Sequence, residues 1–66
     1  MDKIDKIVDR AIAYTESVIA TSPERYRAAR LGLERILDRL TRNAPGHPAL
    51  ERLRNYLDLL DKRDQP

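Results

Sequence analysis

Apolar residues recur at steps of three and four along nearly the whole chain, a pattern typical of amphipathic helices. The clearest case is the central segment 23–42. At about 100° per residue, its apolar positions fall within an arc of roughly 80–100°, the width of a stripe that faces a core. These positions are Tyr26, Ala29, Leu33, Ile36, Leu37 and Leu40. The pattern therefore predicts one long central helix over this segment.

Two further helices are predicted on either side, over about 2–20 and 48–62. The apolar stripe of the first spans roughly 140°, which is more than one neighbouring helix covers, so this helix is expected to contact two others. Its stripe consists of Ile4, Ile7, Val8, Ala11, Ile12, Thr15, Val18 and Ile19, with Tyr14 at the margin. The last helix carries leucines at a/d spacing: Leu50, Leu53, Leu57 and Leu60, with Tyr56 beside them. Residues 63–66 are predicted to form a frayed tail.

The stretch from Thr21 to Glu24 separates the first two helices. Pro23 removes a backbone donor and disfavours helical geometry at Ser22, so the first helix is predicted to end there. The next helix then starts either with Ser22 as its cap and Pro23 at the first helical position, or with a capping box of Thr21 and Glu24. Because this connection is so short, the two helices are expected to be antiparallel neighbours rather than one kinked helix.

Other helix ends also have recognisable signals. Asp2 is predicted to cap the first helix. The central helix is predicted to end near Asn43, which tolerates the left-handed conformation that ends many helices. Residues 43–48 contain two prolines and a glycine, which predicts a stiff turn, with Pro48 at the start of the third helix. Gly32 costs the central helix up to about 1 kcal/mol relative to alanine. It is retained either for a close helix crossing or as a tolerated accident.

These elements predict a single all-α domain over residues 1–66. The expected fold is a small antiparallel three-helix bundle, or a helical hairpin whose third helix dimerises into a larger bundle. At 66 residues, the chain buries only about 60% of the surface that it exposes when unfolded. Further burial in an oligomer or against a partner would therefore matter for its stability.

Composition excludes several classes of chemistry and location. There is no cysteine, so disulfides, thiolate catalysis and zinc–sulfur sites are ruled out. No apolar run approaches the roughly 20 residues that span a bilayer. The N-terminal segment alternates acids and bases and lacks the apolar core of a secretion signal. We therefore expect a soluble protein of the cytoplasm that does not enter the membrane.

Candidate catalytic residues are scarce. His47 is the sole histidine, lies between prolines and has no acid nearby in sequence, so a structural role in the loop is expected. Ser17 and Ser22 lack a nucleophile signature, and there is no glycine-rich phosphate loop or metal-ligand cluster. Acids that recur in pairs do so at the spacing of a solvated helix face. The chain is predicted to be no enzyme, with no cofactor, no metal and no small-molecule substrate.

Charge is concentrated in the central helix. The chain carries a net charge of +2, but segment 23–42 has six arginines against three acids. Ala28, Leu31, Arg35, Arg39 and Arg42 share the back of this helix, and neither Arg35 nor Arg39 has an acid four residues away. Such a stripe could bind phosphates of DNA or RNA, or carboxylates of a protein. The low net charge and the adjoining acids make nucleic acid the alternative. The codon usage of a GC-rich genome would also explain the arginines.

A few apolar residues fall outside the main stripes. Leu31 lies on the back of the central helix and Leu59 on the back of the third, and a seam joining them with Tyr14 would mark a contact surface. Single exposed leucines are also normal. We predict a protein–protein interaction module, acting as adaptor, chaperone, or inhibitor and regulator of a larger protein, and forming a homodimer or other homo-oligomer. The predicted contact residues are Tyr14, Leu31, Arg35, Arg39, Arg42 and Leu59.

Overall fold

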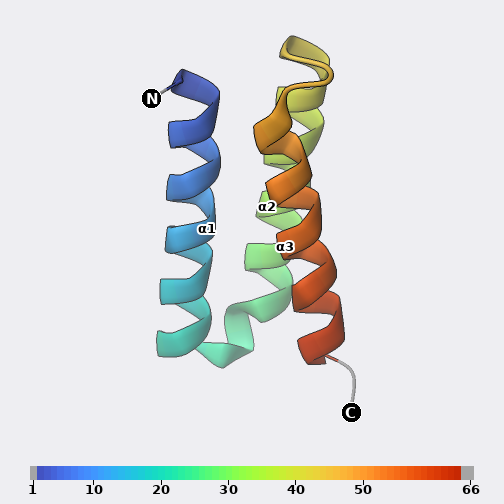
Figure 1. The fold of residues 1–66 in the computed structure, drawn as a ribbon. Helices are drawn as coiled ribbons and strands as arrows, with labels where there is room; N and C mark the ends of the chain where they lie inside the picture. Colours follow the sequence, from blue (N-terminus) through green and yellow to red (C-terminus); the bar gives the residue numbers. More distant parts are fainter. Residues whose placement is uncertain (1, 65–66) are drawn as a thin grey trace.

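The computed structural model describes residues 2–64, which form three helices and, within that range, no strand. The helices are α1 (Lys3–Thr21), α2 (Tyr26–Asn43) and α3 (Pro48–Asp64), with one 3-10 turn, η1 (Pro23–Arg25), before α2. They run alternately up and down, and each contacts the other two (Figure 1). The predicted all-α three-helix bundle is therefore confirmed. Within the described residues, no helix is long and apolar enough to cross a membrane.

The first helix boundary differs in detail from both caps that the sequence predicts. Pro23 does occupy the start of a helical turn, but the chain makes 3-10 geometry for three residues before α2 begins. Ser22 makes no side-chain cap bond, and its backbone N–H instead closes α1 on the Val18 carbonyl. The Thr21 hydroxyl donates to the carbonyl of Ser17, one turn back. Ser22 and Pro23 thus hold the cap and first positions of the 3-10 turn, as one of the two predictions has it, but neither predicted side-chain cap bond forms among the described residues.

The start of α1, the end of α2 and both ends of α3 can also be compared with the sequence predictions. The Asp2 carboxylate accepts a hydrogen bond from the Ile4 N–H (3.1 Å), so the predicted N-cap of α1 is confirmed. The left-handed position predicted at Asn43 is wrong: Asn43 stays helical, and only Gly46 has a positive φ (82°) among the described residues. Helix α3 starts at Pro48 as expected and continues to Asp64, beyond the predicted end at 62. The frayed tail predicted over 63–66 is therefore wrong for residues 63–64, which are helical, and residues 65–66 lie outside the described residues.

The core lies where the three stripes meet. Its fully or nearly buried apolar members are Val8, Leu33, Leu40, Ala49, Leu50, Leu53, Tyr56, Leu57 and Leu60. Helix α3 contributes most of them, and α1 packs against both other helices, as the width of its stripe predicts. The one buried polar side chain described, Thr15, donates its hydroxyl to the Ala11 carbonyl (2.9 Å), so its burial leaves no donor unsatisfied.

Ion pairs between helices join α3 to α1 and to α2, and none of those described joins α1 to α2. Arg52 of α3 binds Asp5 and Asp9 of α1 at 3.0 and 2.9 Å. Arg30 of α2 binds both carboxylate oxygens of Asp61 in α3, at 2.6 and 2.9 Å. Among the side chains that the structure describes, each inter-helix ion pair has one partner on α3 or in the loop before it. Helices α1 and α2 contact each other through apolar side chains on the core side.

Candidate functional site: an apolar groove with an arginine-lined end

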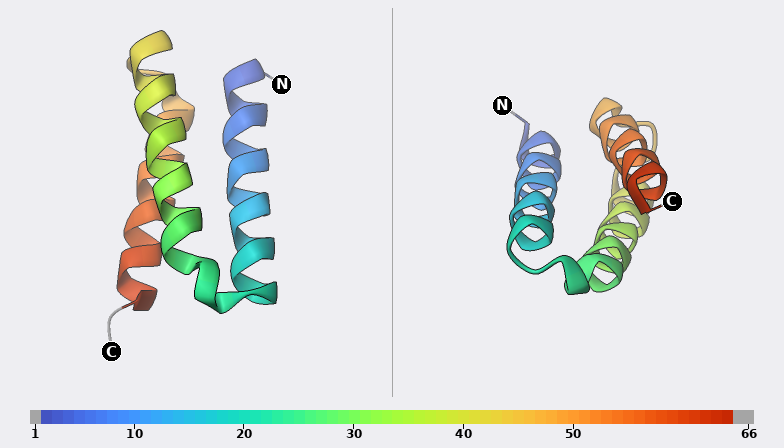
Figure 2. Two further views of the ribbon diagram at one scale, coloured as in Figure 1. Left: turned by 180° about the vertical axis from the view of Figure 1, so that it is seen from behind. Right: turned by 90° about the horizontal axis from the view of Figure 1, so that it is seen from below.

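An apolar groove runs along the seam between α1 and α2. Seen from behind, these two helices stand side by side, and α2 lies in front of α3 (Figure 2, left). Its volume is about 290 Å³. Helix α1 contributes Ala11, Tyr14, Thr15 and Val18, α2 contributes Ala28, Ala29, Gly32, Leu33 and Ile36, and Arg25 lies at the η1 end. Arg25 is the one charged residue in this lining. The groove is therefore an apolar surface that the bundle leaves open to solvent.

Short side chains explain why the seam is not filled. Ala11 faces Ala28, Ala29 and Gly32 across the groove, and these residues present at most one methyl group each. A Cβ atom placed on Gly32 would meet no atom within 4 Å. Gly32 therefore does not serve a close helix crossing, one of the two explanations that the sequence allows. It lies on the wall of an open groove.

The predicted apolar contact residues do not share one surface. Tyr14 is 70% exposed and lines the groove, so its ring adds a large amphipathic surface at the groove's edge. Leu31 and Leu59 are also exposed, at 47% and 51%, but neither belongs to the groove lining. Each lies on the solvent-facing side of its helix, because neither belongs to the apolar stripe that its helix buries in the core.

The three predicted arginines, in contrast, lie together. Arg35, Arg39 and Arg42 line a second, polar depression with Asp38 and Asn43 near the end of α2. Its volume is about 350 Å³. All three arginines are exposed, and none forms an ion pair with the side chains that the structure describes. The arginines of α2 that face away from α3 thus keep their charge available, whereas Arg30, facing α3, is paired.

The polar depression continues the α2 wall of the groove. Gly32, Ile36 and Arg39 follow one another at four- and three-residue steps, so they lie along one stripe of the helix. Arg35 and Arg42 lie beside Arg39, both on the side of that stripe away from Ile36. A ligand lying along the α2 side of the groove would pass from apolar contacts at Gly32 and Ile36 to three arginines at the far end.

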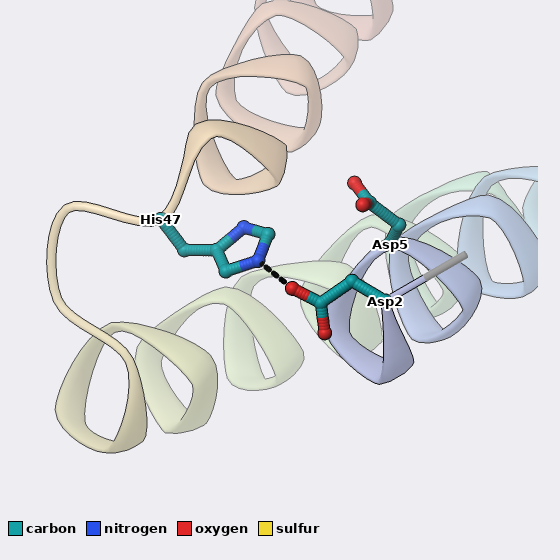
Figure 3. A group of neighbouring side chains, drawn as sticks. All are labelled: Asp2, Asp5 and His47. Atoms are coloured by element: carbon teal, nitrogen blue, oxygen red, sulfur yellow. Dashed lines mark hydrogen bonds and ion pairs between the residues drawn. The ribbon is translucent and has the colours of Figure 1, made fainter.

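A separate polar cluster lies where the loop after α2 meets the start of α1 (Figure 3), at the opposite end of the bundle from η1 (Figure 1). His47 Nε2 lies 2.5 Å from Asp2 Oδ2, and His47 Nδ1 accepts a hydrogen bond from the Ala49 N–H at 3.0 Å. His47 therefore caps α3 while it holds the start of α1. The hydrogen bond from His47, with that from the Ile4 N–H, lowers the pKa of Asp2 below its ordinary value of 3.8.

These contacts make the cluster a poor metal site. Asp2, Asp5 and His47 bring three possible ligand atoms within 4.8 Å of one another. Since His47 Nδ1 accepts from Ala49, a neutral ring carries its proton on Nε2, where it donates to Asp2. A metal ion at Nε2 would force that proton onto Nδ1, against the Ala49 N–H. The donor set fits a hydrogen-bonded cap, the structural role that the sequence predicts for His47.

Glu16 links α1 to α3 by a second polar network. It accepts hydrogen bonds from the Tyr56 hydroxyl (2.7 Å) and from Arg63 (2.9 Å). These two bonds lower the pKa of Glu16 below its ordinary value of 4.5. Burial, together with the bond to Glu16, raises the pKa of Tyr56. The network joins α1 to α3, and none of its three residues lines the groove between α1 and α2.

No family model, curated protein or solved structure matched the chain. We therefore argue its function from the geometry of the groove and its charges. Sequence reasoning selected Tyr14 and the arginines but did not single out the groove walls. The sequence does contain a sign of the groove: small residues occupy the sides of α1 and α2 that face each other, namely Ala11, Ala28, Ala29 and Gly32. Such residues predict a close crossing or an open groove equally well, and only the helix separation decides between the two.

Proposed function

We propose that the chain is a small, non-enzymatic protein–protein interaction module that acts in the cytoplasm as an adaptor, chaperone or regulator of a larger protein. The observation that carries this proposal is the open apolar groove between α1 and α2, edged by the exposed Tyr14. Solvent-facing apolar grooves between helices are a common docking site for a helical segment of another protein. Tyrosine and arginine, which edge this groove, are enriched at interface hot spots.

In this proposal the contact surface consists of the groove and its arginine-lined end. Tyr14 contributes a rigid aromatic contact, and Arg35, Arg39 and Arg42 contribute charged contacts at the rim. Leu31 and Leu59 line neither the groove nor the polar depression, and as contact residues they stay predictions of the sequence pattern alone. Self-association of the chain also stays a prediction, and a dilution series by light scattering would test it.

The test compares proteins captured from the native host by three immobilised forms of the chain. The wild type is set beside Gly32→Leu, which fills the groove, and Asn55→Leu, which adds the same side chain at an exposed site on α3. Circular dichroism first establishes that all three are helical. A partner held by the wild type and Asn55→Leu, but lost from Gly32→Leu, supports the proposal. Capture of the same proteins by all three forms contradicts it.

A nucleic-acid-binding regulator is the second candidate, favoured by the three arginines that have no acid partner among the described side chains. Against it, Asp38 lies in the same depression, and the carboxyl end of a helix is the negative end of its dipole. A mobility-shift assay at low and moderate salt decides between them, because phosphate contacts are strongest at low salt. If DNA and RNA fail to bind at low salt, or bind equally well to an Arg35→Glu/Arg39→Glu variant, this candidate is wrong.

A further inference from the structure

We infer, on the basis of the proposed function, that the occupant of the α1–α2 groove is an acidic amphipathic helix of the partner protein. The apolar face of that helix would lie against the small residues of the groove, and its carboxylates would meet the arginines at the rim. The inference names the chemistry of the partner segment, which the proposed function leaves open.

The shape of the site favours a helix as the occupant. The groove lies between two antiparallel helices, on a seam that α3 leaves uncovered. A helix added there would pack between α1 and α2 and extend the three-helix bundle to a four-helix arrangement. The separation of packed helices depends on the side chains at their contact. Alanines and glycine on the α2 wall therefore admit a close approach of another helix backbone.

The charges around the site select an acidic partner. The residues that line the groove and the polar depression include four arginines, Arg25, Arg35, Arg39 and Arg42, and one acid, Asp38. Arg25 lies at the η1 end of the groove and the other three lie toward the end of α2. A helix along the groove would thus meet a cation near each of its ends. Opposite charges at a rim mainly set the choice and the orientation of a partner.

The same charges disfavour a second copy of this chain in the groove. Two copies joined by their α1–α2 faces would bring four arginines and one acid on each side into proximity. Like charges across an interface suppress the wrong partner. The acids of α1 that could offset them, Asp5, Asp9 and Glu16, are already paired with arginines of α3.

Selection from a displayed peptide library tests the inference directly. Each peptide is about 18 residues long, a helix of about 27 Å, with leucine and alanine fixed on one face. The remaining positions vary among glutamate, lysine and glutamine. The library is selected on the wild-type chain after depletion on Gly32→Leu. We expect the winners to be rich in glutamate, and their affinity to fall at least about tenfold for Arg35→Glu/Arg39→Glu, since both cations are reversed.

Several outcomes would overturn the inference. Winners rich in lysine, winners without charge bias, or no winners at all would show that the groove does not take an acidic helix. A dimer of the chain in sedimentation velocity that Gly32→Leu abolishes would make a second copy the occupant. Duplex DNA that displaces the selected peptides would make phosphate the ligand.

The two proposals can fail separately. If host proteins are captured by the wild type and lost from Gly32→Leu, but the library yields no acidic winners, the inference about charge fails and the interaction module stands. If acidic peptides are selected and no host protein is captured, the groove has the inferred chemistry and the proposed function is wrong.

Discussion

Replacing Gly32 by alanine should stabilise the protein. Gly32 lies in the middle of α2 with helical backbone geometry, where glycine is entropically unfavourable. A Cβ atom there would meet no atom within 4 Å, so the added methyl group encounters no steric penalty. Most substitutions in a folded protein destabilise it. A stabilising effect of Gly32→Ala is expected only because the groove leaves space for the added methyl group.

The expected magnitude follows from helix propensity. Alanine is favoured over glycine in a helix interior by about 0.8–1.0 kcal/mol. The methyl group gains little hydrophobic stabilisation, because it projects into an open groove rather than into the core. We therefore expect the free energy of unfolding to rise by about 1 kcal/mol, which raises the melting temperature of a domain this small by about 4–8 °C.

Gly46→Ala is the matched control. A Cβ atom at Gly46 also meets nothing within 4 Å, but Gly46 has a φ of 82°. The left-handed conformation costs an L-residue about 1–2 kcal/mol, so this variant should be less stable than the wild type. Urea unfolding followed by circular dichroism measures both changes. If Gly32→Ala lowers stability, the groove at Gly32 is closed in solution and the reasoning is refuted.

Three further predictions concern the core, the polar links and the cap. Leu53→Ala should destabilise the bundle by about 2–5 kcal/mol, whereas exposed Leu59→Ala should change stability by less than about 0.5 kcal/mol; both are measured by urea unfolding. The stabilisation from the lowered pKa of Glu16 is complete above its ordinary value of 4.5 and is lost as the pH falls through the lower folded value. Melting temperatures should therefore fall less steeply in acid for Glu16→Gln than for the wild type, and equal slopes would contradict this. His47→Ala should lower the free energy of unfolding by about 1 kcal/mol, because the cap of α3 is lost. Added Zn²⁺ should leave the melting temperature of the wild type unchanged. A rise would mean that the cluster of His47 with Asp2 binds metal.

The fold was predictable because helical periodicity is local. The a/d leucines of the last helix, Leu50, Leu53, Leu57 and Leu60, are all buried, as their spacing requires. Pro23 and Pro48 act on their own backbone, so each marks the start of a helical turn correctly. The cap of Asp2 likewise involves a residue two positions away.

What the sequence did not predict depends on positions brought together by packing. The link between Asp2 and His47 joins residues 45 positions apart, and Arg30 and Asp61 are 31 apart; no local pattern specifies either. The left-handed conformation expected at Asn43 occurs instead at Gly46, in the turn beyond Ala44, the C-cap of α2, because glycine takes a positive φ more readily. The groove itself depends on the separation between α1 and α2, which the sequence of neither helix contains.

Methyl NMR of the chain bound to its captured partner, or to a selected peptide, shows whether the ligand lies in the groove between α1 and α2. Val18 and Ile36 line the groove, and Leu59 lies exposed on α3 as an internal reference. If the groove is the binding site, the methyl groups of Val18 and Ile36 show large shift changes and those of Leu59 show none. Changes at Leu59 with unperturbed groove methyl groups would contradict it.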